Sequence, residues 1–369
     1  MGSNYKKLGG YIRQIDTRNS DARLGEDNLY GISVTKEFII SHANLVGVTF
    51  DSYKVVAPRQ FAYIPDTSRR GDKIAISLNT FGKDIIVSSI CSVFEIIDED
   101  ELLPEYLMLW FMRPEFDRYA RFMSNGSARE VFDWDSMCGV ELPVPSLPEQ
   151  RKIVHDYQVI TDRIELLRKM NENLEEQAYT LFQQAIGESE KDGVLSDLAI
   201  ITMGTSPEGE TMNNVGEGEV FYQGRTDFGF RFPTVRLYTT EAVRRAKCGD
   251  VLMSVRAPVG DINIAKEDCA IGRGLASIRP KDKCYSFMYY TMKALYFELQ
   301  RFNDEGTVFG AITKDDLAGQ KVAVLNNSER KAFDEKAKPI DACIRNNEYE
   351  IFTLQTLRNN ILSGLAKGA

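Results

Sequence analysis

Two stretches of apolar residues, spaced alternately four and three residues apart, constrain this 369-residue chain more than any other feature. One stretch lies within residues 148–187 and the other within 328–369. This spacing places the apolar side chains along one narrow side of a helix, which is buried when a second helix packs against it. The predicted seam residues are Ile153, Tyr157, Ile160, Ile164, Leu167, Leu174 and Leu181 in the first stretch, and Phe333, Ile340, Ile344, Ile351, Leu354 and Ile361 in the second. We therefore predict two long helices that pair within the chain. Periodicity by itself leaves the direction of the pair open.

The ends of the two predicted helices carry recognisable signals. The first opens at Leu147-Pro148-Glu149-Gln150, where proline suits the first turn and the acid favours the positive end of the helix dipole. It ends at Gly187, which gives a length of ~58 Å at 1.5 Å per residue. The second helix begins with polar residues at 328–329 and frays at Gly364. Pro339 lies inside it and is expected to kink or divide it, because proline lacks the amide hydrogen that a helix interior needs.

Each seam contains one asparagine, Asn171 in the first helix and Asn347 in the second, and the two positions are not equivalent. One interpretation is a polar residue tolerated at a wet end of the helix pair. The other is a buried asparagine that fixes the register of the helices. The sequence leaves both open.

A similar order of elements precedes each predicted helix. The shared motifs, in chain order, are GDKIAI (71–76) and GDVLMS (249–254), aromatic-rich helical stretches at 103–112 and 285–295, and the turns Gly126-Ser127 and Gly306-Thr307. After these turns the match runs without a gap at an offset of 180 residues, pairing Phe132 with Ile312 and Gly139 with Gly319. This order indicates a duplicated unit. Short β-rich stretches broken by Gly, Pro, Asn and Asp, followed by helices, predict a mixed α/β fold for each globular half.

Catalytic and metal-binding patterns are missing. The chain has only two histidines, His42 and His155, and six cysteines without metal-ligand spacing. It has no GxxxxGK[ST] phosphate loop, and no apolar run approaches the ~18 residues of a membrane-spanning helix. We expect a reduced, cytoplasmic protein that is not an enzyme, has no metal site and does not contact a membrane. Its net charge of −9 argues at first sight against a nucleic-acid partner.

Residues 141–184, with a proline-rich strand end, then LPEQ and a heptad helix, resemble the first central helix of the specificity (S) subunit of type I restriction-modification enzymes. In the second half, 195–207, 248–265 and 306–317 resemble a target-recognition domain of that family. One departure is the opening of the second helix, which reads NNSERKAF instead of a full LPEQ.

The resemblance implies an α/β (α+β) fold with two tandem α/β target-recognition domains and two long helices. The helices would pair as an antiparallel coiled coil, which gives an internal pseudo-two-fold repeat. The implied parts are recognition domain 1 at 1–147, a central helix at 148–187, recognition domain 2 at 188–327 and a C-terminal helix at 328–369.

The implied function is non-catalytic, sequence-specific binding of double-stranded DNA at a split, asymmetric target, with the helix pair setting the gap between its halves. The implied partners are two modification (methyltransferase) subunits and motor/nuclease restriction subunits. S-adenosylmethionine, ATP and Mg²⁺ would belong to those partners, with no cofactor in this subunit. The alternative is a coiled-coil scaffold or adaptor with two α/β protein-binding heads and no DNA role. The acidic balance supports this alternative, which leaves the LPEQ opening unexplained.

Candidate DNA contacts are polar side chains in Gly- or Pro-bounded loops at predicted strand ends, because such groups read base edges and phosphates. In the first half they are Arg59, Gln60, Tyr63, Arg69, Arg70, Lys73, Asn79, Lys83, Ser127 and Arg129. In the second half they are Gln223, Arg225, Thr226, Arg231, Arg236, Tyr238, Arg256, Arg273 and Thr307, with Arg225 and Arg256 expected to help read one half-site. Neither globular part is basic, with 16 basic against 21 acidic side chains in 1–147 and 17 against 20 in 188–327. The basic side chains must therefore gather on one face, and we expect weak DNA affinity for this subunit alone.

Overall fold

The structure is a computed structural model that describes residues 5–41, 47–67, 71, 73–125, 130–187, 192–303 and 310–367. The chain divides into two units. Unit 1 is Met1–Ile164 with Thr353–Ala369, and unit 2 is Glu165–Phe352. The division runs through both long helices rather than at their ends, so each unit combines a globular part with a segment of each helix. Among the described residues, no helix has both the length and the apolarity of a membrane span.

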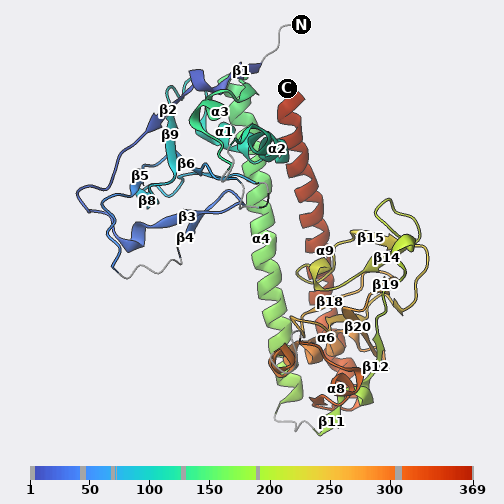
Figure 1. The fold of residues 1–369 in the computed structure, drawn as a ribbon. Helices are drawn as coiled ribbons and strands as arrows, with labels where there is room; N and C mark the ends of the chain where they lie inside the picture. The colour runs from blue at the N-terminus through green and yellow to red at the C-terminus, as the bar shows by residue number, and fades with distance from the viewer. Residues whose placement is uncertain are drawn as a thin grey trace. The chain divides into compact units, whose positions relative to one another are not determined.

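The two long helices are α4 (Leu147–Ile186) and α9 (Asn327–Gly364), drawn in green and red in Figure 1. Every predicted seam residue is buried or half-buried. Within unit 2, Phe182 near the end of α4 contacts Phe333 near the start of α9, with 5.7 Å between ring centroids. Further back along α4, Asn171 is hydrogen-bonded to Asn347, which lies further along α9. The helices therefore pair antiparallel, and the expected fold is confirmed.

Helix α9 runs through Pro339 without interruption, so the expectation that proline divides it was wrong. The missing backbone hydrogen bond and the ring clash of an interior proline cost ~3 kcal/mol or more. On either side of it, Ala337 and Ile344 are fully buried against the core. Pro339 is itself exposed, so its ring lies outside the seam.

The LPEQ motif has a structural explanation at the start of α4. Glu149 Oε2 accepts hydrogen bonds from the backbone amide and the hydroxyl of Ser146, which closes the first turn. The Gln150 side chain is fully buried and accepts a 2.9 Å hydrogen bond from the Leu103 amide. Its amide group donates to the carbonyls of Glu101 and Pro145. Gln150 thus ties α4 to the segment that leads into helix α1 (Pro104–Phe111).

The start of α9 lacks the LPEQ motif but makes equivalent contacts with different residues. Glu329 Oε2 accepts from the Asn326 amide, as Glu149 does from Ser146. Arg330 occupies the position of Gln150 and pairs through Nε with Asp282 Oδ2 at 2.5 Å. Asp282 lies just ahead of helix α6 (Tyr285–Ala294). The Arg330–Asp282 ion pair therefore connects α9 to α6 in the way that the Gln150 side chain connects α4 to α1.

The globular part of unit 1 is a four-stranded antiparallel sheet with smaller strand pairs and helices around it. The sheet has the order β2 (Ile12–Ile15), β9 (Ser92–Ile96), β6 (Phe61–Ile64), β7 (Ala75–Leu78). The two-stranded pairs are β1 (Tyr5–Lys7) with β10 (Glu141–Pro143), β3 (Tyr30–Ile32) with β4 (Phe38–Ile40), and β5 (Lys54–Val56) with β8 (Ile85–Val87). Helices α1, α2 (Pro114–Met123) and α3 (Trp134–Cys138) complete it. Its core centres on Phe61 and Phe94, which stack with 4.8 Å between centroids.

Unit 2 repeats this plan with a larger second sheet. The four-stranded sheet has the order β12 (Ala199–Met203), β20 (Leu275–Pro280), β17 (Val251–Ser254), β18 (Ile262–Ile264). The five-stranded sheet has the order β13 (Met212–Asn213), β15 (Leu237–Thr239), β14 (Glu219–Tyr222), β19 (Cys269–Ile271), β16 (Arg245–Ala246). Strand β11 (Gly193–Val194) pairs with β21 (Lys321–Val322), and the helices are α5 (Leu195–Leu198), α6, α7 (Tyr296–Gln300) and α8 (Lys314–Ala318).

The hydrogen bonds of the two units correct one part of the predicted repeat. The Gly249 amide donates to the Ala265 carbonyl, and in unit 1 the Arg59 amide donates to the Asn79 carbonyl in the same way. Both donor residues have positive φ, 89° at Gly249 and 68° at Arg59. Strand β17 therefore corresponds to β6, and β18 to β7. The match of GDKIAI (71–76) with GDVLMS was wrong, because the first motif enters β7 whereas the second enters β17.

The match after the predicted turns agrees with the structure. The Phe132 amide donates to the Pro65 carbonyl at 2.9 Å, and the Ile312 amide donates to Val255 at 3.1 Å. The loop after β6 in unit 1 is therefore the counterpart of the loop after β17 in unit 2. The halves share one plan, and their loops differ in length.

Candidate nucleic-acid interface

Four loops of unit 2 meet at one edge, where strands β12, β14, β17 and β19 end. The Gly272 amide donates to Tyr222, and the Gly204 amide donates to Leu275, both at 2.8 Å. The Val255 amide donates to Gly274 at 3.0 Å. We call this set of loops, residues 204–206, 223–226, 255–261 and 272–274, the loop edge.

Two glycines allow the loops of this edge to approach so closely. A Cβ atom at Gly204 would lie 2.2 Å from the carbonyl oxygen of Gly272. A Cβ at Gly274 would lie 2.8 Å from the carbonyl oxygen of Gln223. Only glycine fits at these two crossings, because any side chain would force the backbones apart.

Most second-half candidates lie on or next to the loop edge. Gln223, Thr226, Arg256 and Arg273 are exposed there. Arg256 is also joined by a β-bridge to Ala311. Among the described residues, neither Arg256 nor Arg273 has an ion-pair partner, so both guanidinium groups are available to an anionic ligand.

Two further arginines at this edge are already paired. Arg225 forms an ion pair with Asp261 from the neighbouring loop. Arg236 pairs with the buried carboxylate of Asp227 and donates to the Thr226 hydroxyl at 3.0 Å. The Arg225 pair is largely exposed and worth little in stability, so Arg225 can exchange partners at small cost, whereas Arg236 is held by a buried carboxylate.

The structure corrects three candidates, which are buried. Tyr63 is fully buried in the core of unit 1, and burial raises the pKa of its hydroxyl to about 12. The Asn79 side chain donates to the carbonyls of Val56 and Lys83 and holds its own turn. Arg231 is 1 % exposed and pairs with carboxylates of both long helices. A group enclosed in this way cannot reach a duplex. Tyr238 is half-buried on β15 and packs on the core.

The first-half candidates do not gather at one place. Arg59, Gln60 and Lys83 lie where β6 begins and β7 ends, which is the opposite end of the sheet from the loop that follows β6. Arg59 is paired with Glu99 and Glu105, which hold the pKa of its guanidinium above its usual value. Gln60 donates to Glu95 at 2.7 Å. These three residues therefore lie apart from Lys73, and their role as DNA contacts stays a prediction.

Lys73 is exposed in the loop between β6 and β7, the counterpart of the second-half loop that carries Arg256. The remaining candidates, Arg69, Arg70, Ser127, Arg129 and Thr307, lie outside the described residues, as does His42.

Ser206 belongs to the loop edge and was missed. Its hydroxyl accepts a hydrogen bond from the Arg273 amide at 3.3 Å. In the sequence, the GTSP run at 204–207 stands only as part of a stretch that resembles the family's target-recognition domain. The signal that could have found it is Gly204, a glycine that directly follows a β-rich stretch and so suggests a close approach of backbones.

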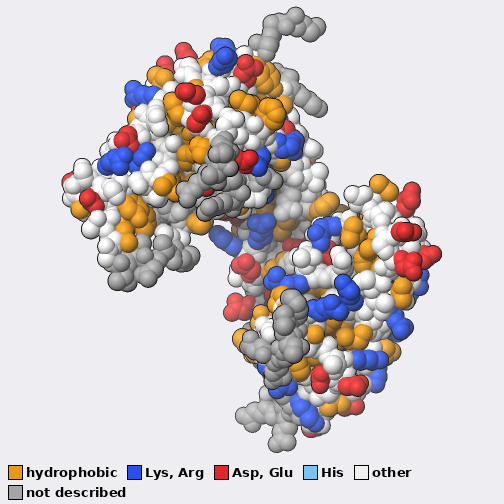
Figure 2. All heavy atoms as spheres, in the orientation of Figure 1, with side chains coloured by type: hydrophobic (Ala, Val, Ile, Leu, Met, Phe, Trp, Pro, Cys, Tyr) orange, Lys and Arg blue, Asp and Glu red, His pale blue; other side chains and the backbone are white. Residues whose placement is uncertain are grey.

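On the face that Figure 2 draws, the described basic side chains are not gathered apart from the acidic ones. Figure 2 shows Lys/Arg and Asp/Glu side chains interspersed over the visible described surface of both units. The cationic character of the loop edge is therefore local, and it rests on a few arginines rather than on a broad basic face.

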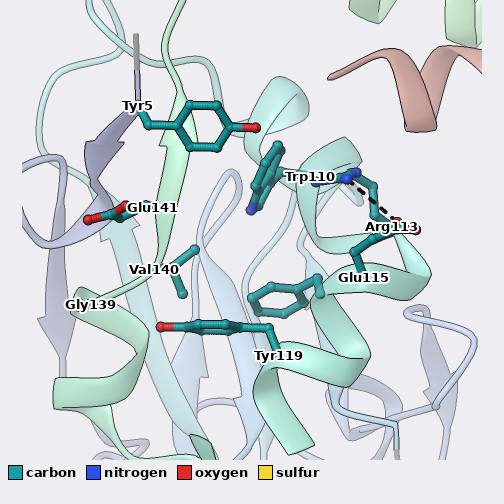
Figure 3. A pocket seen from close by; sticks show the side chains of 9 residues that line it. Tyr5, Trp110, Arg113, Glu115, Tyr119, Gly139, Val140 and Glu141 are labelled. Carbon is teal, nitrogen blue, oxygen red and sulfur yellow. Dashed lines mark ion pairs between the residues drawn. The ribbon is translucent and has the colours of Figure 1, made fainter. Parts of the chain in front are cut away.

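Unit 1 also contains a pocket of about 400 Å³ between α1, α2 and β10, shown in Figure 3. Aromatic rings form much of its wall, and Arg113 stacks over Trp110 at 4.2 Å and pairs with Glu115 at 3.5 Å. Its lining residues are Tyr5, Trp110, Arg113, Glu115, Phe116, Tyr119, Gly139, Val140 and Glu141. They include no histidine, cysteine, serine or lysine, and no group of metal-binding side chains occurs among the described residues.

Comparison with known proteins gives consistent matches. Residues 69–176 match the family model described as "Type I restriction modification DNA specificity domain". The putative type I restriction enzyme MjaX specificity subunit of Methanocaldococcus jannaschii is 33 % identical over 250 residues, which cover 62 % of this chain and 59 % of that protein. The MjaIX specificity subunit of the same organism is 22 % identical over 310 residues, covering 74 % and 70 %. The crystal structure of the type I restriction-modification system S subunit from M. genitalium covers 98 % of this chain and 95 % of that one, with a TM-score of 0.60 and 13 % identity. This last likeness shows the fold alone.

Proposed function

We propose that this chain, which carries a type I restriction-modification DNA specificity domain, is the sequence-reading subunit of such a complex and binds a split, asymmetric DNA target. The observation that carries the proposal is the loop edge of unit 2. It presents exposed Arg256 and Arg273 beside the polar side chains of Gln223 and Thr226. Arginine pairs with guanine and glutamine with adenine in the major groove, so this set suits base recognition.

The asymmetry of the target follows from a difference between the two halves. Arg256 forms a β-bridge with Ala311, and at the corresponding place in unit 1 Asp66 forms a β-bridge with Val131. An arginine in one half thus stands where the other has an aspartate. Two side chains of opposite charge at equivalent positions, Asp66 and Arg256, are not expected to recognise the same bases, so the two half-sites would differ.

The antiparallel helices α4 and α9 would set the length of unread DNA between the half-sites. They would also offer a surface to two modification subunits, which motor/nuclease subunits would join for cleavage. Methyl transfer from S-adenosylmethionine and ATP- and Mg²⁺-dependent steps would occur on those partners, in the cytoplasm. This chain would carry out no chemistry. The scaffold alternative leaves the specificity-domain match over residues 69–176 unexplained.

The experiment is co-expression of this chain with a type I modification (methyltransferase) subunit from a neighbouring reading frame, followed by mapping of methylated adenines across the host genome. We expect two short, different half-sites separated by a gap of fixed length. Methylation at one continuous motif, or the same pattern without this chain, would contradict the proposal.

A further inference from the structure

Arg231 is a charged residue enclosed in the interior of unit 2. It is 1 % exposed, and its guanidinium lies 4.0 Å from the centroid of the Tyr289 ring. Nη1 donates to Asp341 Oδ1 at 2.8 Å, and Nη2 lies 3.3 Å from Glu175 Oε1. Nη2 also donates to the Tyr290 hydroxyl at 3.1 Å. This side chain therefore has partners on three separate elements.

Those partners join the globular part of unit 2 to both long helices. Glu175 lies on α4, Asp341 on α9 and Tyr290 on α6. Each carboxylate has another partner, because Asp341 accepts from the Ser286 hydroxyl at 2.5 Å and Glu175 pairs with Lys293. Two cations thus balance two carboxylates in a buried network.

The loop that ends at Arg231 begins at the loop edge. Hydrogen bonds hold this loop at three places, the first at the Arg231 carbonyl, which accepts from the Ile264 amide at 2.9 Å. The Asn263 side chain accepts from the Gly229 amide at 3.0 Å and donates to the Gly229 carbonyl at 3.1 Å. The buried Asp227 carboxylate accepts from the Gln223 amide at 2.7 Å. The loop is therefore held at three places between Gln223 and Arg231, two of them on strand β18.

We propose that Arg231 is a positioning residue that fixes the second reading loop relative to the helix pair, and so determines where the second half-site falls along the DNA. This inference rests on the proposed function. Apolar residues often stabilise an interior as well as a buried ion pair does, so such a pair contributes more to defining one geometry than to stability. The planar guanidinium can hold two carboxylates in fixed directions at once, which an apolar side chain cannot do.

Unit 1 supplies a matched control in Lys36. This lysine is also buried, at 7 % exposure, and lies in the turn between β3 and β4. Its Nζ pairs with Asp117 of α2 at 2.8 Å and donates to the Phe111 carbonyl. These partners belong to the globular part of unit 1. Replacing Lys36 thus removes a buried ion pair without touching the contact to α4 and α9.

The test uses the complex with the methyltransferase and DNA duplexes that carry the mapped half-sites at the native gap or at a gap one base pair shorter or longer. We expect wild type and Lys36→Met to prefer the native gap equally. We expect the preference of Arg231→Met to fall about tenfold, since a hydrogen bond to a charged group is worth about that factor. Arg231→Lys keeps the positive charge but loses the planar guanidinium, and it replaces Arg231→Met in the test if that variant does not fold. We expect its preference for the native gap to lie between those of wild type and Arg231→Met. An unchanged preference in the folded Arg231 variant would overturn the proposal.

A second measurement separates this inference from the proposed function. Hydrogen exchange of the amides at 223–230 in the same complexes is expected to speed up in Arg231→Lys and to stay unchanged in Lys36→Met. If the wild-type complex shows no gap preference, the split-target function is refuted. Faster exchange in Arg231→Lys would then still support the role of Arg231 in holding the loop. Unchanged exchange in Arg231→Lys would overturn that role.

Discussion

Asn347 of α9 donates a 2.8 Å hydrogen bond from Nδ2 to Oδ1 of Asn171 on α4, inside the seam between the helices. Asn171 is 1 % exposed, and its own Nδ2 donates to Glu348 Oε1 at 3.0 Å. The interpretation of these asparagines as polar residues at a wet end was therefore wrong. Since each satisfies the other at only one alignment of the helices, the pair favours one register.

We expect Asn347→Ala to lower the free energy of unfolding by about 1–3 kcal/mol, because Asn171 Oδ1 is left buried without a donor. The double variant Asn171→Leu/Asn347→Leu should unfold at higher urea than Asn347→Ala, because it removes both polar groups together. Urea unfolding followed by circular dichroism measures both effects. Asn173→Ala, on the exposed side of α4, is the control, and an equal loss in Asn347→Ala and this control would contradict the prediction.

Glu348 gives a pH dependence with a definite sign. Burial raises the pKa of its carboxyl, against the hydrogen bond from Asn171, which lowers it. A carboxyl whose pKa is raised by folding destabilises the fold at neutral pH, and this penalty disappears as the pH falls through the folded pKa. We expect Glu348→Gln to raise the melting temperature at pH 7, with a smaller difference from wild type at pH 4.5. A difference independent of pH would show that the charge is not responsible.

Arg256→Ala and Arg273→Ala should each weaken DNA binding by the assembled complex and relax base preference in one half-site. Loss of one good base contact costs ~1–3 kcal/mol of discrimination. Arg245→Ala is the matched control, because Arg245 is an exposed arginine that is not part of the loop edge and pairs with Glu219 at the start of β14. Methylation of duplexes with single base changes measures the preference. An equal effect of all three substitutions would indicate a general charge effect.

Adding one heptad to both α4 and α9 should lengthen the preferred gap between half-sites by about 3 base pairs. Seven residues add ~10.5 Å of helix, and each base pair spans ~3.4 Å. The seam keeps its phase because whole heptads are inserted in both helices. Mapping methylated adenines gives the new gap. A gap that stays at the wild-type length would rule out the helices as its determinant.

The sequence predicted the long helices well, because a helix seam is a local pattern. Ile164, Leu167 and Ile344 are buried as their spacing predicted, because that spacing places them on one side of a helix. The duplication was also visible after the turn, from Phe132 and Ile312 onward. Before that point the loops differ in length, and a short Gly-Asp motif was matched to the wrong strand.

The candidate site was less predictable, because exposure depends on partners distant in sequence. Arg225 and Arg231 lie six residues apart in one polar loop and look equivalent in the sequence. The tertiary structure leaves the first half-exposed and encloses the second between Glu175 and Asp341. The sequence by itself determined that two long helices pair and that an α/β unit is repeated, since periodicity and motif order are properties of the chain. Only the tertiary structure decided which arginines face solvent, because the carboxylates that bury a guanidinium are brought to it by folding.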